Sequence, residues 1–276
     1  MKIPFTKAHG AMNDFLLTWS GDVPASNLPE IAKQICDRNT GVGADGWLLV
    51  TKAKPGADYD GEIRLINSDG SDAEMSGNGT RCAAAFLLEA GIGREEVTIL
   101  TGAGKKHLRL KGRQGLECIF EMNMGSPIVH EGDLLHFLPM HNDKIQVTIL
   151  NVGNPQCVVF VDAFDFDWES LGAELERHPY FPNKTNVSFV KPVDEHTIDV
   201  RFFERGAGVT MSSGTGSTGA MAAAVLRGIA KSPVTVSTPA GPLALTWASA
   251  SADIFLVGPA EIVASGDFFA RRFKNL

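Results

Sequence analysis

The chain has 276 residues, of which 44% are hydrophobic and 21% are charged, and its formal net charge is -7. These values are ordinary for a globular protein, and the acidic balance argues against a nucleic-acid partner. No apolar run is long enough to span a membrane, and residues 1–10 lack the apolar stretch of a signal peptide. We therefore expect no membrane partner and a cytoplasmic location, in which the four cysteines are free thiols.

Short strands alternate with a few helices along the chain. The segments predicted as strands are rich in Val, Ile, Phe and Thr and are separated by Gly, Pro, Asn or Asp. In chain order we predict strands 3–9 and 14–19, helix 27–37, strands 46–51 and 61–66, helix 80–90, strands 96–101, 106–110, 117–122, 146–152 and 157–161, helix 168–177, strands 186–191 and 197–203, helix 216–227, and strands 234–237, 243–246 and 254–257. The basic stretch 105–113 alternates and is interpreted as the solvent face of a strand.

A short pattern occurs twice. Glu74-Met-Ser-Gly-Asn-Gly-Thr80 and Met211-Ser-Ser-Gly-Thr-Gly-Ser217 share a serine and two glycines at the same spacing. Each copy follows a predicted strand and precedes an alanine-rich apolar helix, which a glycine follows as a common C-terminal cap. The repeat predicts two similar domains, each with its own turn before a buried helix.

The two glycine turns have the chemistry of an anion-binding site. The first N–H groups of a helix lack acceptors within the helix and lie at the positive end of its dipole, and glycine permits close backbone approach. Each turn therefore suits a carboxylate or a phosphate, although serine is also an ordinary helix cap. Gly214-Thr-Gly-Ser-Thr-Gly219 is followed by no acidic residue at the distance that a dinucleotide site requires. The dinucleotide pattern therefore fails on context, and because the cysteines and histidines lack metal-ligand spacing we expect no metal.

Further short motifs occur in order from Asn13 to Gly216. They are Asn13-Asp-Phe15, Gly41-Val-Gly-Ala-Asp-Gly46, Asn67-Ser-Asp-Gly70, Glu74-Met-Ser-Gly-Asn-Gly-Thr-Arg81, Gly153-Asn-Pro155, Asn186-Val187, Glu204-Arg-Gly206 and Ser213-Gly-Thr-Gly216. In this order and spacing they resemble the motifs of the diaminopimelate epimerase family. An ordered series of this kind is far more specific than any single motif.

The resemblance implies an α+β fold of two pseudo-symmetric domains. Each is expected to be a mixed β-sheet or barrel wrapped around a central α-helix, with the site in the cleft between the domains. We place the halves at 1–118, joined by the C-terminal tail 264–276, and at 119–263. The resemblance further implies a homodimer and the epimerisation of LL-diaminopimelate to the meso form, in lysine biosynthesis, without pyridoxal phosphate. Two bases, one on each face of the amino-acid substrate, would move the α-proton.

The family's site residues carry over by position. Ser76 and Ser213 occupy the two positions to which the resemblance gives acid–base roles, and Glu204 is the third candidate catalytic residue, as a base near them. The glycine turns are expected to hold the α-carboxylate. The positions implied to contact the substrate are Asn13, Asn67, Gly77, Asn78, Asn154, Asn186, Glu204, Arg205, Gly214 and Thr215.

The match departs from the family at Ser76 and Ser213, where the family has cysteine, and at Gln156, where it commonly has histidine. A thiol has a pKa of about 8.5, and a serine hydroxyl is weaker by on the order of 5 units, or roughly 7 kcal/mol. A helix N-terminus supplies only about 0.3–2 kcal/mol. A neighbouring base could activate a hydroxyl, and Glu204 is the best candidate.

Several explanations of the serines are open. They could be natural and belong to a slow or altered epimerase, or they could be engineered replacements of cysteine. The chain could instead be a same-fold isomerase or dehydratase that acts on another amino or imino acid. It could also be a catalytically silent paralogue that binds amino acids.

Overall fold

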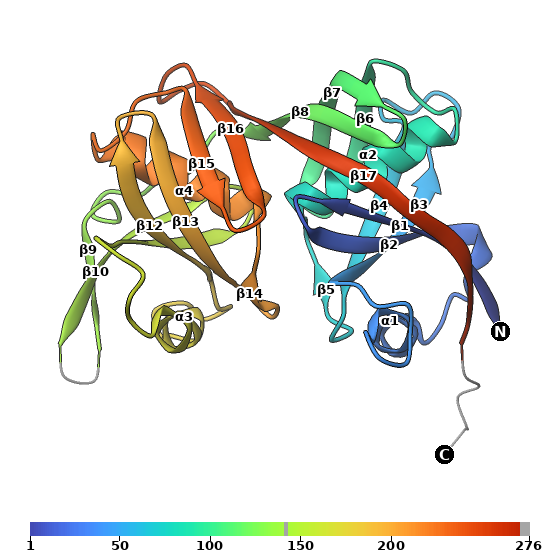
Figure 1. Ribbon diagram of the computed structural model, residues 1–276, viewed down its shortest axis with the longest axis horizontal. Coiled ribbons are helices and arrows are strands. Elements are labelled where there is room, and N and C mark those ends of the chain that lie inside the picture. Colours follow the sequence, from blue (N-terminus) through green and yellow to red (C-terminus); the bar gives the residue numbers. More distant parts are fainter. Residues whose placement is uncertain (141–142, 271–276) are drawn as a thin grey trace. The chain divides into compact units, whose positions relative to one another are not determined.

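The computed structural model describes residues 1–140 and 143–270 (Figure 1). The chain divides into two compact units, which are Met1–Met122 with the chain from Pro259 onward, and Asn123–Gly258. Residues 271–276 of the predicted tail 264–276 lie outside the described residues.

The first unit consists mainly of strands, with one helix outside them and one inside. Its elements are β1 (Lys2–Gly10), β2 (Asn13–Trp19), the 3-10 turn η1 (Ser20–Asp22), α1 (Leu28–Cys36), β3 (Gly46–Lys52), β4 (Gly61–Asn67), β5 (Asp72–Ala73), α2 (Gly77–Glu89), β6 (Glu96–Thr101), β7 (Gly104–Gln114), most of β8 (Glu117–Gly125) and the later part of β17 (Ile254–Phe269).

The strands of the first unit pair into a closed ring. β1–β2, β3–β4, β6–β7 and β7–β8 are antiparallel, whereas β2–β3 and β4–β6 are parallel. β17 pairs with β8 and, antiparallel, with β1, and this closes the ring. A closed sheet has no free edge and encloses a core, and α2 contacts β1, β2, β3, β4, β6 and β7 within it.

The second unit repeats this series of pairings. Its elements are β9 (His136–Pro139), β10 (Lys144–Asn151), β11 (Pro155–Phe160), α3 (Trp168–Glu176), β12 (Asn186–Asp194), β13 (Thr197–Glu204), β14 (Gly208–Thr210), α4 (Gly214–Leu226), β15 (Val234–Thr238), β16 (Gly241–Trp247) and the start of β17. β10–β11, β12–β13, β15–β16 and β16–β17 are antiparallel, and β11–β12 and β13–β15 are parallel. α4 contacts β10–β13, β15 and β16. The predicted α+β fold of two similar halves, each wrapped around a helix, is confirmed.

The central helices are buried on all sides, as their apolar sequences predict. α2 and α4 each have 13 residues, and every residue of 77–87 and of 214–224 is buried. Each helix ends at a left-handed glycine, Gly91 with φ 73° and Gly228 with φ 69°. The N–H of Ile92 donates back to the carbonyl of Leu87 at 2.9 Å, and the corresponding bond from Ile229 is 2.8 Å. These bonds satisfy carbonyls that a helix end otherwise leaves open, and the predicted glycine caps are confirmed.

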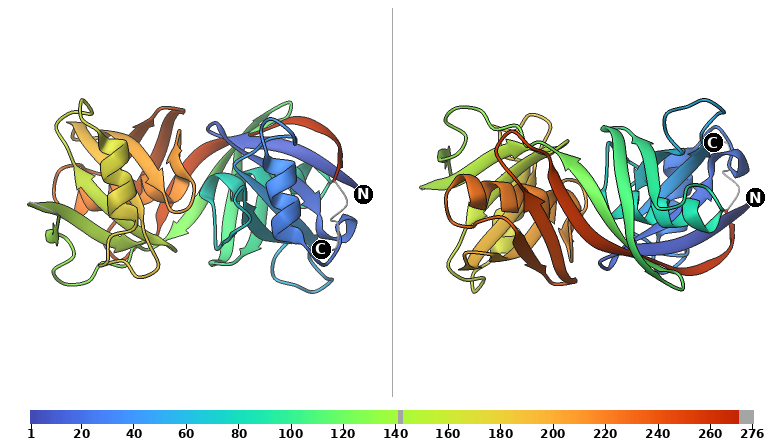
Figure 2. Two further views of the ribbon diagram at one scale, coloured as in Figure 1. Left: turned by 90° about the horizontal axis from the view of Figure 1, so that it is seen from below. Right: turned by 90° about the horizontal axis from the view of Figure 1, so that it is seen from above.

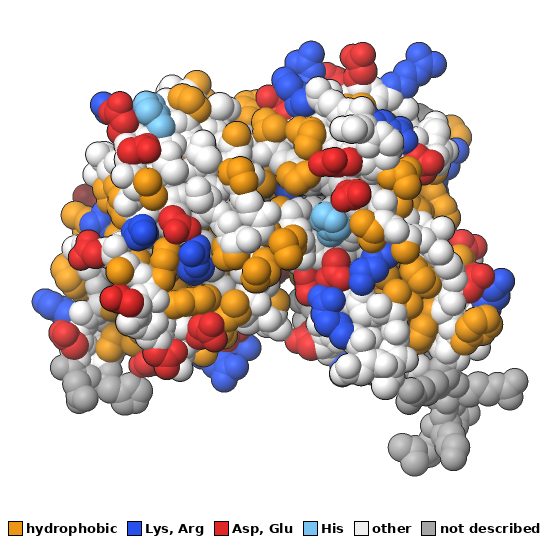
Figure 3. Space-filling view, in the orientation of Figure 1, with side chains coloured by type: hydrophobic (Ala, Val, Ile, Leu, Met, Phe, Trp, Pro, Cys, Tyr) orange, Lys and Arg blue, Asp and Glu red, His pale blue; other side chains and the backbone are white. Residues whose placement is uncertain are grey.

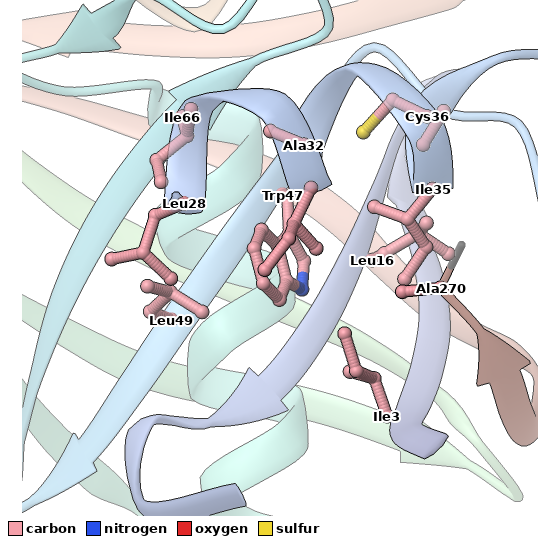
Figure 4. Close-up of a cluster of buried hydrophobic side chains, with 12 residues drawn as sticks. Ile3, Leu16, Leu28, Ala32, Ile35, Cys36, Trp47, Leu49, Ile66 and Ala270 are labelled. Carbon is pink, nitrogen blue, oxygen red and sulfur yellow. The ribbon is translucent and has the colours of Figure 1, made fainter. Parts of the chain in front are cut away.

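α1 and α3 lie outside the strands of their own units (Figure 2). α1 packs on β3 and β4, and α3 packs on β12 and β13. Beneath α1, the side chains of Leu28 and Ile35 contact a cluster that includes Trp47 and Ile66 (Figure 4). The indole N–H of the fully buried Trp47 donates to the hydroxyl of Thr18 at 2.9 Å, so this core leaves no indole proton unsatisfied.

Some element boundaries differ from the predictions for identifiable reasons. α2 begins at Gly77 and α4 at Gly214, earlier than predicted, because a capping serine places the glycines in the first helical turn. The predicted strand 254–257 is too short, because β17 continues through Pro259 and Gly266 to Phe269. β5, β9 and β14 were not predicted, since strands of this length show too little alternation.

Surface charge is mixed. In β7 the side chains of Lys105, His107 and Arg109 are exposed, as predicted for this stretch, whereas Lys106 is buried. On the face drawn in Figure 3, basic and acidic side chains are interspersed. Among the described residues, no helix has both the length and the apolar character needed to cross a membrane.

Candidate active site

The end of β13 and the start of α4 bring a carboxylate and a hydroxyl together. Ser213 caps α4, where its Oγ accepts the N–H of Gly216 at 3.0 Å and donates to Oε2 of Glu204 at 2.7 Å. The other carboxylate oxygen, Oε1, accepts the hydroxyl of Thr210 at 2.7 Å. Ser213 is 2% exposed and Glu204 is half-buried. A carboxylate at this distance can accept the serine proton, so the pair has the geometry of a base-activated hydroxyl.

Asn154 lies beside the first turn of α4. Its Nδ2 donates to Oγ1 of Thr215 at 3.2 Å, and its Oδ1 accepts Nε2 of Gln156 at 2.6 Å. Gln156 is fully buried, and its Oε1 has no hydrogen-bond partner within the described part of the chain. Gln156 therefore orients the Asn154 amide toward the helix start, and an amide cannot act as a base.

Two side chains hold the turn that follows Glu204. Asn186 donates from Nδ2 to the carbonyl of Pro155 at 2.9 Å and accepts the N–H of Arg205 at its Oδ1 at 3.1 Å. Glu176, at the end of α3, is 2% exposed and accepts the N–H of Gly206 at 3.1 Å. The turn that carries Arg205 is thus fixed from two elements.

Ser76 has the equivalent position in the first unit. It caps α2, and its Oγ accepts the N–H of Gly79 at 3.1 Å. No other hydrogen bond to this hydroxyl occurs among the residues that the structure describes. Asn67 ends β4 as Glu204 ends β13, but its Nδ2 donates to Oγ of Ser71 at 3.0 Å. The serine of α2 is therefore capped in the same way as that of α4 but lacks the same carboxylate partner.

A buried polar chain runs from α2 toward the start of β3. Nη2 of Arg81 donates to Oδ1 of Asn78 at 2.6 Å, Nδ2 of Asn78 donates to Oδ1 of Asn13 at 3.2 Å, and Nδ2 of Asn13 donates to Oδ2 of Asp45 at 2.7 Å. Arg81 is fully buried and also donates from Nε to the carbonyl of Pro259 at 3.0 Å. Burial lowers the pKa of Arg81 to about 10, which still leaves it protonated at neutral pH. This cation fixes the amide orientation at the start of α2.

The series of hydrogen bonds from Arg81 to Asp45 ends at an ion-pair cluster near the surface. Nη2 of Arg38 lies 2.7 Å from Oδ1 of Asp14 and 2.8 Å from Oδ1 of Asp45, and Nζ of Lys7 lies 3.0 Å from Asp14. Burial acts to raise the pKa of Asp14, but hydrogen bonds from Arg38 and Lys7 outweigh it, so the pKa is lowered. Burial raises the pKa of Asp45, and the charge of Asp14 adds to this effect.

The four cysteines are free, as predicted, and all are buried. Burial raises the pKa values of Cys36, Cys82 and Cys157 to about 12. Although Cys82 lies in α2, such a thiol is almost wholly protonated near neutral pH and is inert as a base. Within the described ranges, no group of three or more His, Cys, Asp or Glu side chains is arranged to hold a metal ion.

The structure brings several of the predicted site residues together within each unit. In the second unit the hydrogen-bonded pairs are Glu204 with Ser213, Asn154 with Thr215, and Asn186 with the backbone of Arg205. In the first unit Asn13 pairs with Asn78, whereas Asn67 bonds to a residue outside the predicted set. Gly77 and Gly214 are the buried first residues of the two central helices.

Sequence reasoning missed four residues that support these pairs. Asp45 and Arg81 lie inside the motifs quoted above. Only Arg81 offered a signal of its own, because it is a charged residue directly after an uncharged turn. Thr210 and Glu176 lie outside every motif. Their contacts arise because β13 and β14 form a hairpin and α3 packs on β13, which local sequence does not reveal.

Comparisons with known proteins match nearly the whole chain. The family model described as diaminopimelate epimerase matches residues 5–129 and 148–263. A diaminopimelate epimerase of Halothermothrix orenii is 35% identical over 280 residues, which cover 96% of this chain and 98% of the relative. Diaminopimelate epimerase 1 of a Nostoc species is 37% identical, with 96% of this chain and 99% of the relative covered.

Solved structures at lower identity share the fold. A hydroxyproline epimerase from Agrobacterium vitis, crystallised with trans-4-hydroxy-L-proline, superposes with a TM-score of 0.74 at 16% identity and covers 96% of this chain and 92% of its own. A phenazine biosynthesis protein of the PhzF family from Bacillus anthracis has a TM-score of 0.70 at 16% identity and covers 98% of this chain and 100% of its own.

Proposed function

The chain belongs to the diaminopimelate epimerase family, and from this premise we propose that it inverts the α-carbon of LL-diaminopimelate to give the meso form, without a cofactor. The observation that carries the proposal is the 2.7 Å contact between Oγ of Ser213 and Oε2 of Glu204 at the start of a buried helix. An equivalent capped serine, Ser76, begins the other central helix. Inversion with two acid–base groups requires that both hydroxyls reach one α-carbon from opposite faces.

In this proposal the helix starts bind the α-carboxylate. Gly77 with Asn78 and Gly214 with Thr215 would present N–H groups at the positive ends of two helix dipoles. The same groups would stabilise the negative charge that develops when the α-proton leaves, because they are already oriented and are buried away from water.

Polar side chains beside the turns would recognise the rest of the substrate. We propose that Asn67, Glu204 and Arg205 surround the reacting head. Asn13, Asn154 and Asn186, with Arg205, would hold the distal amino-acid end. The buried contacts of Asn13 and Asn186 support this assignment, because each amide has its orientation fixed by hydrogen bonds to neighbouring groups.

Conversion of LL-diaminopimelate tests the proposal directly. The protein, at high concentration and with long incubation in deuterated water, should yield meso-diaminopimelate by chiral chromatography and take up α-deuterium. Because serine replaces both thiols, we expect slow turnover. The Ser76→Cys/Ser213→Cys double variant should be faster, since a thiol ionises more easily by on the order of 5 pKa units. A double variant that still binds diaminopimelate but produces no meso form would contradict the two-base arrangement.

A second candidate is an isomerase or dehydratase of the same fold that acts on another amino or imino acid. The unequal surroundings of Ser76 and Ser213 favour it, since a hydroxyl without a base can donate a proton more readily than it can remove one. Screening amino acids for α-deuteration separates the two candidates, and exchange with diaminopimelate alone would eliminate this one. A silent binding protein would instead gain thermal stability from diaminopimelate with no exchange at all.

We also propose that the chain forms a homodimer and works in the cytoplasm. Light scattering coupled to size-exclusion chromatography measures the first directly, and a monomer at micromolar concentration would refute it. Fractionation of the source cells tests the second.

A further inference from the structure

The two glycine turns are alike in backbone but unequal in acid–base chemistry. Glu204 and Asn67 end equivalent strands, at the same interval before the capping serine of each central helix. Oε2 of Glu204 accepts a hydrogen bond from the hydroxyl of Ser213. By contrast, the amide of Asn67 donates to Ser71, and the hydroxyl of Ser76 only accepts a hydrogen bond from a backbone N–H. Among the described residues, a carboxylate is therefore hydrogen-bonded to one capping serine and not to the other.

This difference decides which hydroxyl can remove a proton. A serine that must ionise alone is disfavoured against a thiol by roughly 7 kcal/mol, far more than the 0.3–2 kcal/mol of a helix dipole. Ser213 does not need to ionise, because it can pass its own proton to Glu204 as it receives another. Among the described residues, the hydroxyl of Ser76 has no carboxylate partner and only accepts the N–H of Gly79.

We propose that proton transfer is confined to the face of the substrate served by Ser213 and Glu204, so that the chain exchanges the α-hydrogen of an amino acid with solvent much faster than it inverts the carbon. This inference rests on the proposed function, which brings the head of an amino acid to these turns. As the α C–H bond breaks, its proton bonds to Oγ of Ser213 and the proton of Ser213 moves to Oε2 of Glu204. The electron pair stays on the substrate and is delocalised into the α-carboxylate at the helix starts.

The reverse step returns a hydrogen to the same face. The proton on Glu204 exchanges with solvent, and in deuterated water a deuteron then passes through Ser213 to the α-carbon with its configuration retained. Only one configuration at the reacting carbon places its hydrogen toward this face. One stereoisomer should therefore exchange, and its epimer should exchange far more slowly.

The experiment measures two rates on one sample. LL- and meso-diaminopimelate are incubated separately with the protein in deuterated water. Mass spectrometry follows α-deuterium, and chiral chromatography follows inversion. We expect exchange in one isomer to exceed inversion by about 100-fold or more, the usual contribution of one general base. Glu204→Gln should lower this exchange by about 100-fold or more, whereas Glu195→Gln, which neutralises an exposed carboxylate of the same unit, should not change it.

Each outcome bears on a different claim. Inversion that keeps pace with exchange in the unmodified protein would overturn the one-face inference and leave the proposed function standing. Exchange that survives Glu204→Gln in a variant with an unchanged circular dichroism spectrum would also overturn only the inference. Absence of α-deuterium from both isomers would refute the proposed function and the inference together. As a positive test, Ser76→Cys should raise the ratio of inversion to exchange, because it adds an ionisable group at the other turn.

Discussion

Gly216 is the third residue of α4, and the structure leaves no room for a side chain there. An added Cβ would lie 2.7 Å from Cδ1 of Phe202 and 2.9 Å from Oγ of Ser213. Phe202 is 1% exposed and Ser213 is 2% exposed, so neither can move aside into solvent. Gly216→Ala should therefore overpack the interior of the second unit and displace the hydroxyl that faces Glu204.

Two opposing effects set the size of the change in stability. Overpacking of a buried site lowers the free energy of unfolding by about 1–3 kcal/mol. Replacement of glycine by alanine where the backbone tolerates it raises the same quantity by about 0.4–1 kcal/mol. The midpoints of these ranges give a net loss of about 1.3 kcal/mol for Gly216→Ala, within extremes of about 0 and 2.6 kcal/mol.

The equivalent residue of α2 provides a matched control. A Cβ on Gly79 would lie 3.3 Å from both Cζ of Phe15 and Cβ of Ser76, which requires only small adjustments. Gly79→Ala should therefore stay within about 0.5 kcal/mol of the unmodified protein. Urea denaturation followed by circular dichroism and tryptophan fluorescence measures both variants, with separate fits if the two units unfold separately. If Gly216→Ala proves as stable as Gly79→Ala, the close packing described for α4 is refuted.

Three further predictions concern positions outside the two serines. Glu176→Ala should lower the free energy of unfolding by about 1–3 kcal/mol, because it leaves the N–H of Gly206 without its acceptor. The same variant should raise KM more than it lowers kcat, and an unchanged KM would contradict a role in holding the turn. The pKa of Asp14 is lowered in the folded protein, so its contribution to stability is complete above the unfolded value of about 3.9 and is lost as pH falls through the lower folded value. Arg38→Met should therefore lower the free energy of unfolding at pH 7, and the difference from the unmodified protein should shrink in acid. An equal loss of stability at both pH values would refute this. The four buried cysteines should resist a thiol reagent at pH 8 until the protein is unfolded, and rapid labelling of the native state would contradict their burial and raised pKa values.

The repeat made two similar halves predictable, because two similar turns before two alanine-rich segments indicate two similar buried helices. What it did not predict is the start of each helix. Gly77 and Gly214 read as loop residues, yet the hydroxyl of the preceding serine satisfies an open N–H and draws them into the first turn. The continuation of β17 past Pro259 was also missed, because proline is rare inside strands. Pairing with strands far away in the sequence outweighs that local preference.

The candidate site was predictable residue by residue only as far as the motifs extend. Glu204 was named as the best candidate to activate a hydroxyl, and it lies within hydrogen-bond distance of Ser213. The contrast with Asn67 was not anticipated, although both residues stand at equivalent places in the sequence, because side-chain pairing depends on the hairpin that follows each strand. Arg81 illustrates the same limit, since its partners come from segments far apart in the chain.

Because β17 is the last strand to be translated, it affects the order in which the two units can finish folding. The other strands in the ring of the first unit are complete once β8 has been made, but β1 and β8 keep unpaired edges until residues 259–269 leave the ribosome. Bare edges are templates for pairing with other chains. The first unit to be translated would thus be the last to finish folding, and in the interval it would be the part of the nascent chain most in need of a chaperone.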